Sequence, residues 1–186
     1  MGRTGSRRKT RGLLRLVRDE RGVTVIEFAL LGLPFFTIVA AILETTLIFF
    51  AAQILDSAVN DSARLIRTGQ AQSAGYEIAD YRRAICSGLY RLFDCNAVKI
   101  KVTVIDRFSD YEPGSPVATG EDCTPEACEW TLEEGFAPGV GNQVVIVEAY
   151  YRWPTLLRLP GFNMQNLPDG TRLLGAARLF QNEPFT

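Results

Sequence analysis

An uninterrupted apolar segment near the N-terminus dominates the pattern of hydrophobic and polar positions. Val23 to Leu55 reads VTVIEFALLGLPFFTIVAAILETTLIFFAAQIL, 33 residues in which Glu27 and Glu44 are the only charges. As a helix this segment would extend about 50 Å, whereas the hydrocarbon core of a bilayer is about 30 Å thick. The pattern therefore predicts a transmembrane helix that continues beyond the membrane.

The positions that follow predict more helix. Apolar residues recur at helical spacing from Ile54 to Ile66, with charged and polar residues between them, and Gly69 is a suitable stop. We expect a short linker over residues 70–75 and a second amphipathic helix over about 74–93, which ends at Asp94 to Asn96.

The second half of the chain predicts strands. Residues 98–104 alternate between apolar and polar side chains, which is the period of a half-buried strand. The pattern predicts further strands at residues 144–151 and 173–180 and a weak strand at residues 129–132. Residues 135–142 are predicted to form a turn. The predicted class is α+β, with helices on one face of a small antiparallel sheet of three to four strands. The apolar connection 153–164 belongs either to the core or to a partner-binding patch.

Charge sets the predicted orientation. Residues 1–22 hold eight basic and two acidic residues, a balance of +6, and because the whole chain carries −1 the remainder carries −7. A basic arm directly before a span indicates a cytoplasmic N-terminus rather than a nucleic-acid patch, and the apolar region is too long for a conventional signal peptide. The predicted organisation is a basic cytoplasmic leader (1–22), a helix with an exported extension (23–68) and an exported domain (69–186).

All four cysteines lie beyond the span, where an exported domain meets an oxidising compartment. Three disulfide pairings are conceivable, and closeness in sequence favours Cys86 with Cys95 and Cys123 with Cys128. The spacings are poor for zinc and the chain has no histidine, so we expect no metal.

Catalytic motifs are lacking, so we predict neither an enzyme nor a cofactor. The chain has no histidine to act as a base, and residues 135–142 lack the Lys-Ser/Thr ending of a phosphate loop. The acidic residues of the loop could surround calcium, but their spacing is not that of an EF-hand, which favours a solvated loop. These residues are Asp106, Asp110, Glu112, Glu121 and Asp122.

The sequence GVTVIEF, from Gly22 to Phe28, resembles the processing site of type IV prepilins, in which a glycine precedes the cut and a glutamate is the fifth mature residue. RGVTVIEFALLGLPF and ILETTLIFFAAQILDSAVNDSARLIRTGQ resemble the TadE-like pseudopilin family of the tight-adherence (Tad/Flp, type IVc) pilus machinery. AICSGLYRLFDCNAVKIKVTVIDRF and the terminal LFQNEPF add to the likeness. The resemblance implies a pilin-like fold and a minor pilin-like subunit, cut between Gly22 and Val23 by a prepilin peptidase.

The resemblance also implies partners and roles. The partners are the peptidase, other pilin-like subunits, inner-membrane platform proteins and the lipid bilayer. The implied location is a bacterial inner membrane, with the C-terminal domain in the periplasm, and the subunit could also enter the surface pilus. Its implied role is in pilus assembly, adhesion and secretion-type assembly. Glu27 would pair with the new amine of a neighbouring subunit; the alternative is a carboxylate that reaches the membrane surface. Pro34 removes one hydrogen bond of the helix and predicts a kink. Glu44 is expected to be a solvated carboxylate at the membrane interface; the alternative is that it pairs with an arginine on another subunit. The competing function is an uncleaved, TadG-like envelope protein whose exported domain binds or senses.

Overall fold

A computed structural model of the chain describes residues 23–118, 123–125, 128–159 and 162–185. Its contacts define two compact units, residues 1–43 and 44–186, and helix α2 (Val23–Arg67) contributes to both. In the first unit the described residues are all helical. The second unit is an α+β domain, which confirms the fold class predicted from the sequence.

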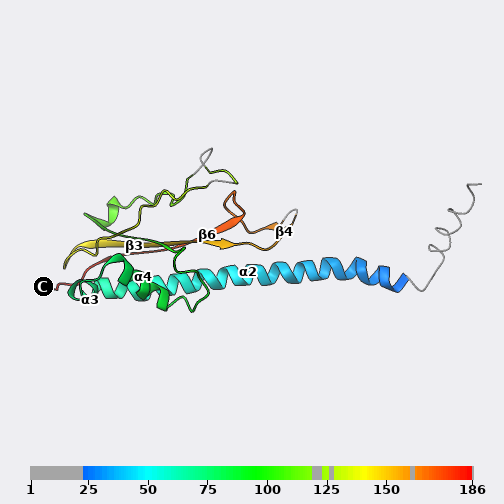
Figure 1. Cartoon of the computed structure of the whole chain (residues 1–186), viewed down its shortest axis with the longest axis horizontal. Helices are drawn as coiled ribbons and strands as arrows, with labels where there is room; N and C mark the ends of the chain where they lie inside the picture. The colour runs from blue at the N-terminus through cyan, green and yellow to red at the C-terminus, as the bar shows by residue number, and fades with distance from the viewer. Residues whose placement is uncertain (1–22, 119–122, 126–127, 160–161, 186) are drawn as a thin grey trace, which may run out of the picture. The chain divides into compact units, whose positions relative to one another are not determined.

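A four-stranded sheet is the framework of the second unit (Figure 1). The strand order is β2-β1-β3-β6, and the long central strand β3 is antiparallel to both of its neighbours. Two short strands, β4 and β5, form a separate antiparallel pair. The strands are β1 (Lys99–Ile105), β2 (Gly135–Phe136), β3 (Val144–Pro154), β4 (Arg158–Leu159), β5 (Phe162–Asn163) and β6 (Thr171–Gln181).

The sheet is mixed, which corrects the expectation of a wholly antiparallel one. β2 runs parallel to β1, with Gly135 opposite Lys101, although the sequence predicts a turn at this point. The connection 106–134 is long enough to return the chain to the edge of β1 in the same direction. The strand predicted at 129–132 is reduced to an isolated bridge between Val117 and Trp130. Two residues of pairing leave no detectable period in the sequence.

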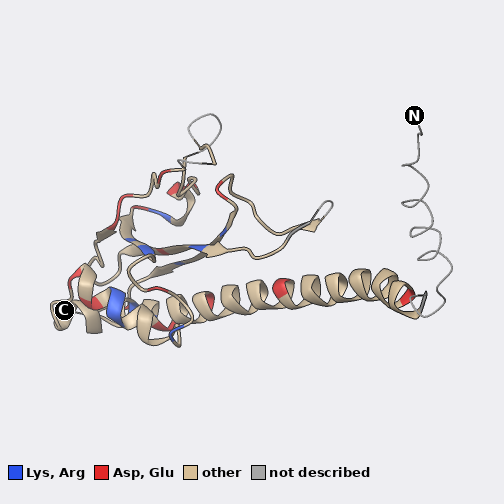
Figure 2. Cartoon of the chain, turned by 45° about the vertical axis from the view of Figure 1, so that its right-hand side comes forward, with Lys and Arg blue, Asp and Glu red and all other residues tan. Residues whose placement is uncertain are grey.

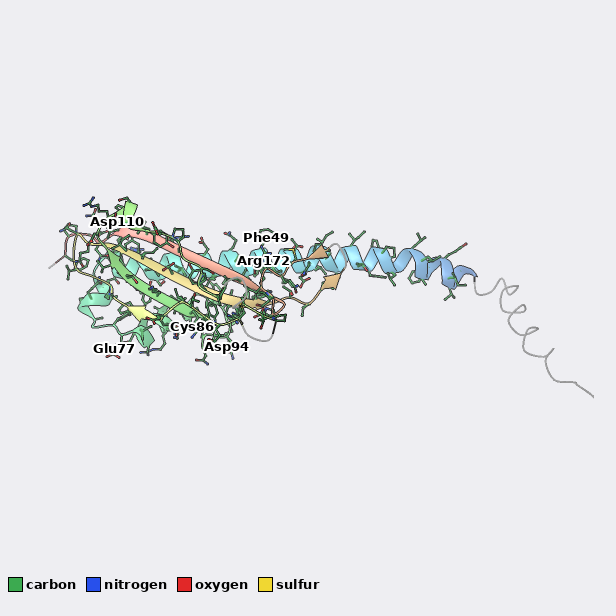
Figure 3. All side chains as sticks on the ribbon, turned by 90° about the horizontal axis from the view of Figure 1, so that it is seen from above. Phe49, Glu77, Cys86, Asp94, Asp110 and Arg172 are labelled. Atoms are coloured by element: carbon green, nitrogen blue, oxygen red, sulfur yellow. A yellow bond between two sulfur atoms is a disulfide. The ribbon has the colours of Figure 1, made fainter. Side chains whose placement is uncertain are left out.

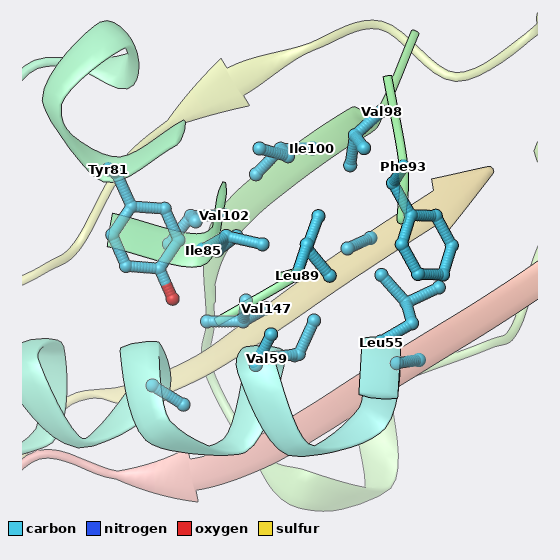
Figure 4. Packing of buried hydrophobic residues seen from close by; sticks show 14 of the residues in the cluster. Leu55, Val59, Tyr81, Ile85, Leu89, Phe93, Val98, Ile100, Val102 and Val147 are labelled. Atoms are coloured by element: carbon cyan, nitrogen blue, oxygen red, sulfur yellow. The ribbon is translucent and has the colours of Figure 1, made fainter. Parts of the chain in front are cut away.

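The core of the second unit lies between α2 and one face of the sheet (Figure 4). The alternation along β1 turns Ile100 and Val102 to the helix. On α2, buried positions recur every three or four residues, because only one stripe of a helix can face a sheet. That stripe is Ile48, Ala51, Leu55, Ala58, Val59 and Ile66.

Two short helices follow α2 where the sequence predicts a linker and one longer helix. Helix α3 (Gln70–Ser73) occupies the expected linker, and helix α4 (Ile78–Ser87) begins with a capping box between Glu77 and Asp80. Helix α4 ends six residues before the predicted Phe93, with Gly88 as its C-cap, and Gly88 packs closely against α2. A Cβ atom on Gly88 would lie only 3.0 Å from that of Ala58.

The C-terminal tail closes the end of α2. The backbone N–H of Glu183 donates to the carbonyl of Arg67 at 2.9 Å, which satisfies one of the unpaired carbonyls at the helix end. Gly69 has φ of +77° and the ring of Phe185 packs against it, so that a side chain has no room at this position. The helix stop predicted at Gly69 is confirmed.

Candidate processing and assembly segment

The first described residue, Val23, is also the first residue of α2, and Gly22 lies outside the described residues. Glu27 is exposed on the second turn, followed by Phe28, which is 69% exposed. Glu27 follows Val23 by four positions, slightly more than one helical turn.

The surface of α2 up to residue 43 is apolar and exposed. Among the described residues, α2 is one helix that is long and apolar enough to cross a membrane (Figure 2). This finding fits a single-pass membrane protein. Residues 23–43 would extend about 31 Å, close to the thickness of the hydrocarbon core. The exposed side chains include Val25, Ile26, Phe28, Leu30, Leu31, Leu33, Phe35, Phe36, Ile38 and Ile42.

Pro34 lies inside α2, which continues as one element through it. Proline has no N–H group, so one hydrogen bond of the helix is missing here. In the next turn the hydroxyl of Thr37 donates to the carbonyl of Leu33 at 2.8 Å, so this polar group is satisfied within the helix. That local partner lowers the cost of a hydroxyl in a lipid-facing helix.

Glu44 differs from the sequence-based expectation. Its side chain is only 6% exposed, so it is not a solvated interfacial carboxylate. It accepts hydrogen bonds from the backbone N–H groups of Leu156 and Leu157, and both of its oxygens lie 3.2 Å from the nitrogen of Leu157. The acceptor is therefore used inside the second unit, to hold the segment that connects β3 to β4.

A second buried carboxylate lies on the face of the sheet that α2 does not cover. Glu148 accepts hydrogen bonds from the hydroxyl groups of Tyr111, at 3.1 Å, and Tyr150, at 3.0 Å. Burial and the nearby Glu148 charge raise the pKa of both tyrosines, which keeps them protonated donors. Tyr111 and Glu148 are among the residues that line a hollow of about 380 Å³ between β1, β3 and residues 110–115 and 131–132.

The acidic loop is only partly described. Glu121 and Asp122 lie outside the described residues, whereas Asp106, Asp110 and Glu112 are exposed. Within the described ranges, no three acidic or cysteine side chains are gathered closely enough to hold a metal ion.

The two disulfides join the pairs that closeness in sequence predicts. Cys86 at the end of α4 is bonded to Cys95, and Cys123 is bonded to Cys128. The first closes a loop against the main core, and the second belongs to a small cluster with Val117.

In the described part of the chain, one helix supplies both the candidate membrane span and part of the domain core, which fits the class of single-pass membrane proteins. Residues 22–64 match the family model described as TadE-like protein, which confirms the resemblance over this segment and supports a protein associated with Tad pili. TadE-like proteins form a structural, pilus-associated family. No significant match was found among the curated proteins or the solved structures, so the pilin-like nature of the domain stays a prediction.

The sequence analysis missed the roles of Glu44 and Glu148. Each is a single acid in an otherwise apolar run, ILETTLI and VVIVEAYY, and an acid in such a run needs a partner when it is buried. That signal identifies a buried acceptor, but it does not identify the donors.

Proposed function

We propose that this protein is a minor pilin-like subunit of a Tad/Flp-type pilus assembly system, which a prepilin peptidase cuts after Gly22. One observation carries the proposal: the TadE-like match covers residues 22–64, from the predicted processing glycine through the apolar part of α2. The predicted processing glycine, the glutamate at the fifth mature position and the apolar span thus fall within one matched segment. The mature chain is held in the inner membrane with its domain in the periplasm.

Cleavage and assembly are linked by charge. The cut creates an ammonium group at Val23 and removes the basic leader, while Glu27 remains as an acid at the start of an apolar helix. A carboxylate in lipid is costly until it is paired, so the amine of a neighbouring subunit is its favoured partner. Such pairing sets the register of one helix along its neighbour. The proposed partners are other pilin-like chains and platform proteins of the inner membrane.

The test is the mass and first residue of the protein purified from membranes of cells that contain the peptidase. We expect a chain that begins at Val23, and a Gly22→Leu variant that keeps all 22 leader residues, because a bulky side chain blocks close approach of the protease to the backbone. Gly12→Leu, which changes a glycine within the leader, is the matched control and should be cut normally. An intact N-terminus in the wild-type protein would contradict the proposal and favour the uncleaved binding or sensing protein.

A further inference from the structure

The loop closed by the Cys86–Cys95 disulfide contains a turn whose residues do not suit its backbone. Tyr90 and Arg91 have φ of +49° and +61°, and the N–H of Leu92 donates to the carbonyl of Leu89 at 2.9 Å. This is the pattern of a type I′ turn, which strongly favours Asn-Gly at its two central positions. Tyrosine and arginine are disfavoured there because their Cβ atoms crowd the backbone.

The residues on either side of the turn are fixed in the core. Leu89 and Phe93 are buried, and the ring of Phe93 packs edge-on against Tyr151 with centroids 4.9 Å apart. With both sides anchored and the disulfide closed, the turn keeps its unfavourable conformation. The central residues could be replaced without loss of these anchors.

The side chains of this turn point away from the core. Tyr90 is 79% exposed, Leu92 is 39% exposed, and Arg91 is exposed with no carboxylate within ion-pair distance in the described part of the chain. An aromatic ring, an arginine and a leucine on a rigid turn have the composition of a protein-binding hot spot. Residues in strained backbone conformations cluster at functional sites, which indicates that these side chains themselves are used.

The segment 106–112 of the same chain has complementary chemistry. Its seven residues carry three carboxylates against one arginine, and Phe108 is 52% exposed between Asp106 and Asp110. Figure 3 places Asp110 and Asp94, which follows the turn closely, in separate parts of the domain, so the two surfaces cannot meet within one copy.

We propose that the turn Tyr90–Leu92 of one copy binds the segment 106–112 of a second copy. The aromatic and leucine side chains of the turn cover Phe108, and Arg91 pairs with Asp106 or Asp110. The two surfaces lie apart on one chain, so a single contact of this kind leaves the turn of one copy and the segment 106–112 of the other available to bind further copies. The inference goes beyond the proposed function, since the contact does not involve the leader or the processing site.

The test uses the full chain, expressed with two different tags in the same membranes, and measures how much of one form is recovered with the other. We expect Arg91→Glu to lower recovery at least fivefold, and the combination with Asp106→Lys and Asp110→Lys to restore it. Arg64→Glu, at another exposed arginine of the domain, is the matched control and should leave recovery unchanged. A wild-type protein that does not self-associate, an unaffected Arg91→Glu variant, or a charge exchange without rescue would each overturn the proposal.

A second variant separates binding from folding. Tyr90→Asn with Arg91→Gly installs the preferred turn residues, so the domain should melt at the same or a higher temperature. We expect recovery of the second copy to fall as in Arg91→Glu. A photo-crosslinking residue at position 90 should join residues 106–112 of another copy. Normal association of the Asn-Gly variant, or crosslinks that map only to other segments or proteins, would show that the turn does not make this contact.

Discussion

The carboxylate of Glu44 in α2 accepts a hydrogen bond from the backbone N–H of Leu157, 113 residues further along the chain. Two backbone donors, the N–H groups of Leu156 and Leu157, thereby reach an acceptor that would otherwise be buried alone. The helix that carries the apolar span thus also fixes the end of the central strand β3. The contact gives one acid in the helix a structural role inside the domain.

Removal of the Glu44 carboxylate should destabilise the domain. Glu44→Ala leaves two backbone donors without their acceptor and should lower the free energy of unfolding by about 1 to 3 kcal/mol. Glu44→Gln, which keeps one oxygen acceptor, should lose less. Thermal unfolding in detergent and hydrogen exchange at Leu156 and Leu157 measure the effect. Glu27→Ala is the control, and equal effects of the two alanine variants would contradict the structure.

The buried tyrosine of α4 gives the domain an alkaline limit. Tyr81 donates to the hydroxyl of Ser62 at 3.1 Å, and burial raises its pKa. The unfolded tyrosine loses its proton near pH 10, before the folded one does, so this contribution to stability is present below about pH 10 and is lost above it. Tyr81→Phe should cost about 0.5 to 1.5 kcal/mol at pH 7 and reduce the loss of stability above pH 10. If the free energy of unfolding fell equally steeply with pH in the variant and the wild type above pH 10, this role of Tyr81 would be refuted.

Glu134 should contribute an acid-sensitive part of the stability. Its burial would raise the pKa, but Arg82, the N–H of Ile100 and Lys99 outweigh burial and hold the pKa below its usual range. A lowered pKa stabilises the fold above the unfolded value of about 4.3, and this stabilisation disappears as the pH falls through the folded value. Glu134→Gln should be less stable than wild type at pH 7, and the difference between their free energies of unfolding should disappear below about pH 4. A gap that is constant from pH 7 to pH 3 would contradict this.

The two disulfides should differ in importance. Replacing Cys86 and Cys95 by serine should cost about 2 to 4 kcal/mol, because this bond constrains a loop whose flanking residues belong to the main core. Replacing Cys123 and Cys128 should cost less, since their cluster is small and lies apart from that core. Chemical unfolding of the two double variants compares them, and non-reducing peptide mapping verifies the remaining bond. The opposite order would show that the loop is held by other contacts.

Glu27 and Gly22 should act at different steps. Glu27→Leu removes a costly acid from the apolar helix, so insertion and cleavage should persist. Co-purification with other pilin-like subunits should fall, because the amine of Val23 loses its partner. Glu27→Asp keeps the charge and should retain part of the association. Normal recovery of the partners with Glu27→Leu would leave Glu27 as an interfacial charge without a role in register.

Several features of this protein depend on local pattern alone and could be predicted before the fold was known. The apolar run from Val23 predicts the helix, the alternation along 98–104 predicts β1, and the short spacing between cysteines predicts their pairing. Each follows from periodicity or from chain distance, which are visible in any sequence. The helix stop at Gly69, two residues after the end of α2, belongs to the same group, because the backbone conformation of this residue favours glycine.

The groups that meet across long chain distances could not be predicted from local pattern, because their contacts form only when the chain folds. The burial of Glu44 depends on donors from residues 156 and 157, and the parallel pairing of β2 depends on where the connection 106–134 returns. The turn at Tyr90 and Arg91 is held by the buried Leu89 and Phe93, against the preference of its own residues. Local propensity predicts neither a distant hydrogen-bond donor nor a conformation imposed by packing, because both are set by contacts that exist only in the folded chain.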